Sequence, residues 1–250
     1  MHDVQAPPAG RPFSDDVAAL AAAEGLGGLR ASFAPKRRSA WSILGLAVFG
    51  LFGLFVFVLP GLFFLWQLWQ TPNVNRKQAA RRIHCFEHGL VLDEPGGPLA
   101  FRWDALSVLQ RITRRYVNGI YVGTSYEYRL FRPDGVKARL TGFYADPEVW
   151  GAAVQHEITR AQLPGVLGLL GGGGTVHFGD MVVNAAGVAT ANRSGVPWGE
   201  VEQVEVRRGT VAVRRAGKWL PWSNTPVHKI PNFFLFLCVV DELRARNGGL

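Results

Sequence analysis

The chain has 250 residues, which is enough for a membrane segment together with one or two small domains. Its formal net charge is +8, so an anionic partner surface suits it better than a cationic one. Its two cysteines, Cys85 and Cys238, are far apart in the sequence, which is not the pattern of a disulfide-rich secreted protein.

Residues 1–38 are rich in Ala, Gly and Pro and contain few large apolar side chains. Ser14 followed by Asp15 and Asp16 is typical of a helix start, because the hydroxyl caps free N–H groups and the acids favour the helix dipole. The glycines at positions 25, 27 and 28 would end such a helix. We therefore expect a flexible N-terminal arm with one short helix.

An apolar segment follows the arm, and no residue between Ser39 and Asn75 is charged. A helix needs about 20 apolar residues to cross the roughly 30 Å hydrocarbon core of a bilayer. Trp41 at one end and Trp66 and Trp69 at the other are typical of interface anchors. Residues 39–72 therefore predict a transmembrane segment, and with it a single-pass protein of the cell (plasma) membrane.

Pro60 and Gly61 lie inside this run and leave two arrangements open. Proline removes a backbone donor, so it would kink a single spanning helix; alternatively, the chain turns there in a re-entrant hairpin. Basic residues flank both ends, at 36–38 and at 76–82, which favours a cytoplasmic C-terminal region only slightly and also suits a hairpin with both ends on one side. Glycines at 45, 50 and 53 would permit close helix packing.

The region after residue 80 is rich in β-strand patterns and repeats itself. Trp103 and Trp198 each precede an acidic residue, an aliphatic residue and a strand. Asn118-Gly119 between two β-prone runs predicts a tight hairpin, and helix starts are expected near Pro147 and Pro231. The pattern predicts one module at 80–163, a glycine-rich linker at 164–174 and a second module at 175–247.

The step of tryptophan, acidic and aliphatic residue resembles bacterial PH-like domains. The stretches at 116–119, 140–147, 216–219 and 230–234 resemble a family of uncharacterised actinobacterial membrane proteins, a domain of unknown function, over roughly residue 39 to the end. The resemblance implies a membrane-anchored α+β protein, mainly β. One transmembrane helix would be followed by two tandem PH-like barrels, each closed by a C-terminal helix. It supplies no catalytic residues.

Residues with metal or phosphate chemistry do not form a recognisable site. His84 and Cys85 would point to opposite faces of a strand, and no second Cys/His pair follows His88 at the spacing of a four-ligand zinc site. The glycines at 171–174 are not followed by the Gly-Lys-Ser/Thr of a phosphate loop. We expect no catalytic residues, no metal and no cofactor.

Basic residues near strand ends form the candidate anionic-surface site. Close to an anionic membrane, each basic residue contributes about 1 kcal/mol to the free energy of binding. The same charges also suit a solvated sheet face, where they discourage edge pairing. Because no aromatic stacking motif accompanies them, nucleic acid is not an expected partner. The candidate residues are Arg111, Arg114, Arg115, Arg207, Arg208, Arg214, Arg215 and Lys218.

The sequence favours a non-catalytic, membrane-tethered binding or scaffold protein whose tandem PH-like modules engage a protein or peptide partner. The alternative is a sensor of anionic lipid headgroups at its own membrane surface, and an enzyme is the least favoured hypothesis. The expected partners are the lipid bilayer, its anionic headgroups and a protein or peptide.

Overall fold

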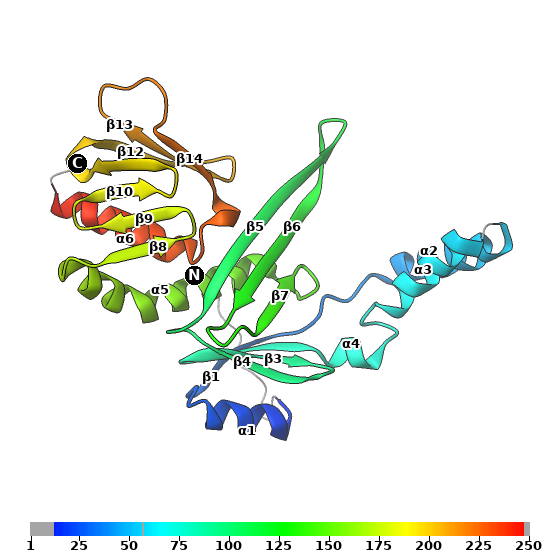
Figure 1. Ribbon diagram of the computed structural model, residues 1–250. Helices are drawn as coiled ribbons and strands as arrows, with labels where there is room; N and C mark the ends of the chain where they lie inside the picture. The colour runs from blue at the N-terminus through cyan, green and yellow to red at the C-terminus, as the bar shows by residue number, and fades with distance from the viewer. Residues whose placement is uncertain (1–12, 57, 248–250) are drawn as a thin grey trace. The chain divides into compact units, whose positions relative to one another are not determined.

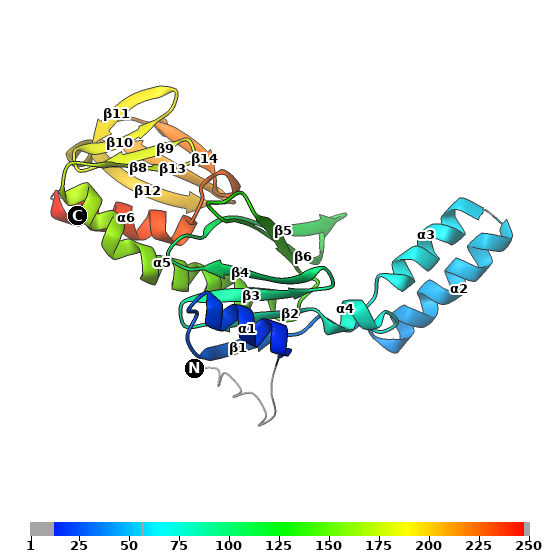
Figure 2. The ribbon, with the colours of Figure 1, turned by 60° about the horizontal axis from the view of Figure 1, so that its bottom comes forward.

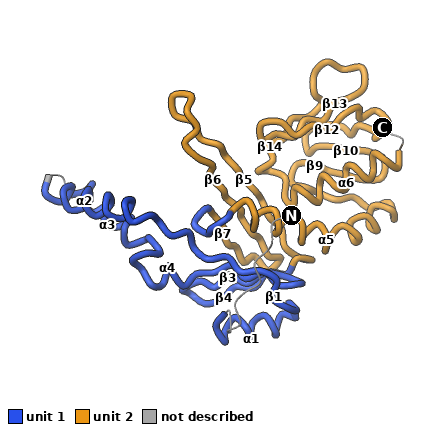
Figure 3. The backbone as a smooth tube through the Cα atoms, turned by 180° about the vertical axis from the view of Figure 1, so that it is seen from behind, with its two compact units in different colours: residues 1–102, 142–146 blue, residues 103–141, 147–250 orange. Residues whose placement is uncertain are grey.

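The computed structural model describes residues 13–56 and 58–247 (Figure 1). The chain divides into two compact units, which Figure 3 distinguishes by colour. Unit 1 comprises residues 1–102 and 142–146, and unit 2 comprises residues 103–141 and 147–250. The first twelve residues of the predicted arm lie outside the described residues.

Unit 1 is built on one antiparallel sheet of four strands in the order β1-β2-β3-β4. The strands are β1 (Leu29–Phe33), β2 (Arg82–Phe86), β3 (Gly89–Glu94) and β4 (Gly97–Arg102). The helices of unit 1 are α1 (Asp15–Ala23), α2 (Ala40–Val56), α3 (Val58–Trp69) and α4 (Arg76–Ala80).

The segment predicted as a flexible arm instead contributes a helix and a strand from residue 13 onward. The hydroxyl of Ser14 caps α1 as expected, accepting from the N–H of Val17. Val17 and Leu26 are buried against Phe86 and Val91 of the sheet. Packing of these few apolar residues on an existing sheet therefore orders a segment too poor in them to build its own core.

The charge-free run does not form one long helix. It is divided between α2 and α3, which lie side by side as an antiparallel pair in Figures 1 and 2. Pro60 stands in the first turn of α3, where its missing N–H costs little, whereas in a continuous helix it would remove a hydrogen bond. The proline thus starts the second helix of a hairpin and does not kink a single one.

No helix in the described part of the chain combines the length and apolar character needed to cross a bilayer. The predicted transmembrane helix is therefore wrong. The single-pass plasma-membrane location that rested on it loses its basis.

Unit 2 contains three antiparallel sheets and two long helices. The first sheet has the order β5-β6-β7, the second β11-β10-β9-β8 and the third β12-β13-β14. The elements in chain order are β5 (Ser107–Val117), β6 (Ile120–Phe131), β7 (Lys137–Thr141), α5 (Pro147–Gly171), β8 (Thr175–Phe178), β9 (Met181–Asn184), β10 (Gly187–Thr190), β11 (Arg193–Pro197), β12 (Val201–Arg207), β13 (Thr210–Arg215), β14 (Ser223–Pro226) and α6 (Phe233–Arg246).

The predicted closed barrels are wrong, because the sheets of the described residues remain separate and no barrel closes. Between β11 and β12 the chain makes a 3-10 turn at Trp198–Glu200, which buries Trp198 and interrupts the ladder. Strand β14 has four residues and ends at Pro226, which has no N–H with which to continue pairing. A four-stranded sheet, a three-stranded sheet and a helix nevertheless follow one another twice along the chain.

Helix α5 continues through Pro164 to Gly171, over most of the segment predicted as a glycine-rich linker. Leu170 is buried in the core of the second half, with Leu163 and Val166 packed against its edge. Burial of these side chains offsets the weak helix propensity of the neighbouring glycines.

Asn232 joins three elements of unit 2 immediately before α6. Its Nδ2 donates to the carbonyl of Leu106 and to Oε1 of Gln162, each at 3.0 Å, and its Oδ1 accepts from the N–H of Val108 at 2.7 Å. The residue is buried and left-handed, with φ 49°. Asparagine tolerates this backbone conformation better than most residues, so one side chain ties β5 and α5 to the start of α6.

We expect Asn232→Ala to lower the free energy of unfolding by about 3 kcal/mol, since three hydrogen bonds of about 1 kcal/mol each are lost. The cost of placing alanine in a left-handed backbone conformation adds to this loss. Asn118→Ala is the matched control, because Asn118 is also left-handed, with φ 50°, but is exposed in the β5–β6 turn. Urea unfolding of the full chain in mild detergent measures both. Equal losses for the two variants would show that the Asn232 side chain carries no such role.

Candidate functional site

The α2–α3 pair, called the apolar hairpin below, has apolar side chains on all its outer faces. No residue from Ile43 to Trp66 is charged or carries a hydroxyl or an amide side chain. The most exposed side chain is that of Phe55, at 92%. The large side chains that are more than half exposed are Trp41, Leu44, Val48, Phe49, Leu51, Phe52, Phe55, Val58, Leu59, Leu62, Phe63, Trp66 and Trp69.

The two helices of the hairpin touch through glycines. A Cβ atom on Gly61 would overlap the backbone nitrogen of Leu54, and one on Gly53 would lie 2.9 Å from the Cα of Gly61. A Cβ on Gly50 would meet the side chain of Leu65. Gly50 and Gly53 therefore permit close packing of α2 on α3 within the hairpin, whereas a Cβ on Gly45 would meet no atom within 4 Å.

The open end of the hairpin is fastened by one asparagine. The N–H of Arg38 donates to Oδ1 of Asn73 at 2.9 Å, and Nδ2 of Asn73 donates back to the carbonyl of Arg38 at 3.2 Å. These reciprocal bonds join residues 35–39, which lead into α2, to residues 70–75, which leave α3. We call these two segments the neck.

A cleft of about 590 Å³ lies at the neck. Its cationic residues are Lys36, Arg37 and Arg38, which are exposed and form no ion pair among the described residues. The other lining residues are Ser39, Ser42, Trp66, Gln67, Gln70, Thr71, Pro72, Gly142 and Phe143. The cleft therefore combines positive charge, hydroxyl and amide groups and two aromatic rings, with no acidic residue in its lining.

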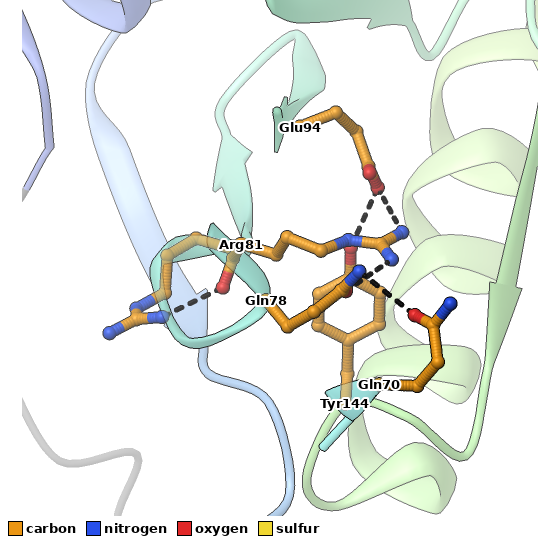
Figure 4. Close-up of polar contacts among 6 residues, drawn as sticks. Gln70, Gln78, Arg81, Glu94 and Tyr144 are labelled. Atoms are coloured by element: carbon orange, nitrogen blue, oxygen red, sulfur yellow. Dashed lines mark hydrogen bonds and ion pairs between the residues drawn. The ribbon is translucent and has the colours of Figure 1, made fainter. Parts of the chain in front are cut away.

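Arg81 holds two sides of the cleft in place, those of Gln70 and Phe143. Figure 4 shows its contacts with Glu94 and Gln78. It donates to Glu94 at 2.6 Å and to Gln78 at 3.1 Å, and Gln78 donates to Gln70 of the cleft. The guanidinium also lies 4.7 Å from the ring centroid of Phe143. Burial opposes the charge of Arg81, but its hydrogen bond and attraction to Glu94 outweigh that effect, so the pKa of Arg81 is raised.

Tyr144 completes this network by donating from its hydroxyl to Glu94 at 3.0 Å. Burial raises the pKa of Tyr144, so it stays a neutral donor at physiological pH. Glu94 therefore accepts from two groups that fix its position.

His84, from the cluster considered for metal binding, is a fully buried residue of β2. Its Nδ1 lies 3.0 Å from the hydroxyl of Ser32 on β1. Burial, together with the charge of Arg82, lowers the pKa of His84 to about 4, so the ring is neutral at physiological pH. No group of three metal-ligating side chains converges within residues 13–56 and 58–247.

The three candidate arginines of β5 lie on two faces of a strand. The predicted Asn118-Gly119 hairpin is confirmed, with Val117 paired to Ile120. In this register Arg111 lies opposite Glu127, Arg114 opposite Thr124 and Arg115 opposite Gly123. Because side chains alternate along a strand, Arg111 and Arg115 share one face and Arg114 projects from the other.

The remaining candidates lie at opposite ends of the β12–β13 pair. Arg207 ends β12, and Arg208, which is left-handed, lies in the tight turn that follows it. Arg214 and Arg215 end β13, and Lys218 follows in the next loop. Arg214 lies 3.8 Å from Glu205 and Arg215 lies 2.5 Å from Glu200. The structure thus does not gather the eight predicted residues into one patch.

Beside Arg215 and Lys218, the loop before β14 exposes Trp219 and Leu220. Trp219 is 92% exposed. Large apolar side chains and basic residues therefore also stand together at the surface in this loop.

Comparison with known proteins places the sequence in a family. Residues 18–248 match the family of unknown function DUF6585. The chain belongs to this family. The DUF6585 match begins inside α1 and ends after α6, so it includes the apolar hairpin and the neck cleft. The expectation of an uncharacterised family is confirmed, and no curated protein or solved structure matches the chain significantly.

In the sequence, Lys36, Arg37 and Arg38 bear only on the orientation of a spanning helix, and they are not among the predicted site residues. The signal in the sequence was their position, because basic residues flank both ends of the same charge-free run. Once that run folds back on itself, both flanks lie at the neck.

We expect Gly61→Ala to separate α2 from α3, because overpacking of this kind costs about 1–3 kcal/mol. Phe49→Cys and Phe64→Cys, whose native rings are 6.1 Å apart, provide a crosslinking pair in a background with Cys85→Ser and Cys238→Ser. A short bifunctional thiol reagent should link the two helices several-fold less efficiently in Gly61→Ala. Gly45→Ala, which meets no neighbouring atom, should leave the yield unchanged; an equal yield in both variants would contradict the close contact at Gly61.

Proposed function

We propose that this protein is a non-catalytic binding protein that attaches to lipid surfaces by inserting the apolar hairpin. The observation that carries the proposal is the exposure of large apolar side chains on all outer faces of α2 and α3, with no polar side chain between Ile43 and Trp66. A helix that is apolar all round is suited to a protein core or to lipid, and not to water.

Lipid suits this surface better than a protein partner does. A partner that docks on one side would leave Phe or Leu side chains exposed on the opposite side, and exposed apolar patches beyond a few hundred Å² are unusual in monomeric proteins. Acyl chains surround the hairpin completely. Burying one phenylalanine side chain is worth about 1.5–3 kcal/mol.

The neck has the composition of a lipid–water boundary. Trp41, Trp66 and Trp69 lie toward the open end of the hairpin, and tryptophan is enriched at the level of lipid headgroups. Lys36, Arg37 and Arg38 precede the hairpin, and Arg76 and Lys77 follow it. Such clusters are attracted to anionic headgroups.

The geometry lets the chain enter and leave the lipid through the same face. Asn73 binds the backbone of Arg38, so the two ends of the hairpin stand at one place. At 1.5 Å per residue the 17 residues of α2 extend about 25 Å, which is enough to carry Phe55 into the hydrocarbon.

We expect Phe52→Ser combined with Phe55→Ser to weaken vesicle binding by at least about a hundredfold, since two phenylalanine side chains, each worth about 1.5–3 kcal/mol, leave the hydrocarbon. Flotation of the full chain with phosphatidylcholine vesicles measures the affinity. Val149→Ser with Leu169→Ser, two exposed apolar residues of α5, should leave it unchanged. A wild-type chain that floats with neither neutral nor anionic vesicles would contradict the proposal.

A second candidate function, binding of a protein or peptide partner, is favoured by the outer part of the β5–β6 ribbon. Strand β7 pairs only with residues 127–131 of β6, so the ribbon continues beyond it without a third strand, as Figure 1 shows. Exposed large side chains on this part are Ile112, Tyr116, Val117, Ile120, Tyr121 and Val122. An extended peptide can add to such an edge as a further strand.

A photo-crosslinking side chain substituted for Ile120 tests this second function in cells that express the full chain. We expect one discrete protein adduct from position 120 and none from the same substitution at the exposed Val149 of α5. No adduct, or identical adducts at both positions, would argue against a partner at the ribbon. The likeness to bacterial PH-like domains and an actinobacterial source stay predictions, and neither proposed function rests on them.

A further inference from the structure

We infer that the neck cleft is a binding site for the phosphate group of an anionic lipid, whose acyl chains lie along the apolar hairpin. The inference rests on the proposed lipid attachment and adds a ligand and a site to it. It starts from three exposed cations that line one cleft together, Lys36, Arg37 and Arg38.

The charge of the cleft is uncompensated. Its lining contains no Asp or Glu, and the sequence contains none between Lys36 and Lys77. By contrast, Arg214 and Arg215 of the candidates predicted from sequence lie beside glutamates. An anion is therefore the ligand whose charge complements this cleft, and arginine suits phosphate because its planar fork donates to two oxygens.

Neutral donors stand next to the cations. The Ser39 hydroxyl accepts from the N–H of Ser42 at 3.3 Å, which leaves its own hydrogen for an acceptor. Oε1 of Gln70 accepts from Gln78, so the two Nε2 hydrogens of Gln70 remain to be donated. A phosphate has several acceptor oxygens and can use cations and neutral donors together.

The cleft also has an apolar side, which distinguishes a lipid from a free phosphate. The rings of Trp66 and Phe143 line it, and Trp66 belongs to α3. From Trp66 the apolar surface continues along the hairpin through Phe63 and Leu62 without a polar interruption. A phosphate in the cleft thus lies at the start of a surface suited to acyl chains.

The walls of the cleft are held in place before any ligand binds. Asn73 fixes the backbone of Arg38, and Arg81 positions Gln70 through Gln78 and Phe143 through its ring. A preorganised site loses less conformational entropy on binding than a flexible basic tail does.

Two full-chain variants test the inference by flotation with vesicles of phosphatidylcholine, alone or mixed with phosphatidylglycerol. Lys36→Gln, Arg37→Gln and Arg38→Gln together should reduce the preference for the anionic vesicles roughly a hundredfold, because each charge near the surface is worth about 1 kcal/mol. The matched control removes three exposed cations that form no ion pair within residues 13–56 and 58–247, by Arg114→Gln, Arg115→Gln and Arg208→Gln, and should keep the preference. Equal losses in the two triple variants would overturn the site.

Gly142→Trp distinguishes a built cleft from diffuse attraction, because it fills the cleft while keeping every charge. A Cβ on Gly142 meets no atom within 4 Å, and the same holds for Gly96, which supplies the control Gly96→Trp. We expect Gly142→Trp, and not Gly96→Trp, to lose most of the anionic preference. A Gly142→Trp chain with the wild-type preference would overturn the inference.

The source of the phosphate is settled by competition. Dihexanoyl phosphatidylglycerol should displace the chain from anionic vesicles at a much lower concentration than glycerol 3-phosphate or inorganic phosphate. Equal displacement by all three would overturn the lipid assignment. Equal binding of the wild-type chain to neutral and anionic vesicles would contradict the cleft site but not the proposed lipid attachment. No binding to either kind of vesicle would contradict the proposed function itself.

Discussion

Arg81 connects the sheet of unit 1 to two sides of the neck cleft, at Gln70 and at Phe143, and the geometry proposed for lipid binding depends on it. Its guanidinium is held by Glu94 of β3, which Tyr144 also binds, and it reaches Gln70 through Gln78 and Phe143 through its ring. Arg81 is only partly exposed, and a charge withdrawn from water in this way is stabilised by pairing and hydrogen bonding. The requirement that stabilises Arg81 therefore also fixes where the hairpin leaves the sheet.

The apolar hairpin imposes the opposite requirement. Its helices contain no charged residue, yet charged residues stand within a few positions of both ends. The transition is made by Asn73, whose amide satisfies both the N–H and the carbonyl of Arg38, and by Thr71, whose hydroxyl donates to the carbonyl of Leu68 at the end of α3. Hydrogen bonds of this kind are needed wherever a helix end leaves backbone groups without partners. The neck is thus where backbone satisfaction, positive charge and interface-type tryptophans coincide.

Local chemistry in the sequence was enough to predict several elements. Asn118-Gly119 gives the β5–β6 turn, Ser14 gives the start of α1, and Pro147 gives the start of α5. What the sequence did not determine depends on contacts between distant residues. Hydropathy measures how apolar a run is and not whether it folds back, and the contact of Gly53 with Gly61 that closes the hairpin becomes visible only in three dimensions. The sequence likewise did not show that the sheets stay open, which depends on how strands end, as β14 does at Pro226.

The candidate site shows the same division between composition and geometry. Clustering in sequence suggested Arg111, Arg114 and Arg115, but the two-residue period of a strand already places Arg111 and Arg114 on opposite faces. Lys36, Arg37 and Arg38 line one cleft, because the chain leading into α2 is fastened to the chain leaving α3. Whether a basic residue belongs to a binding site depends on which other residues the fold places beside it. In the described chain, the cleft at the neck brings cations and hydroxyl and amide donors to the start of an apolar surface. These groups complement the phosphate and the acyl chains of a phospholipid, respectively.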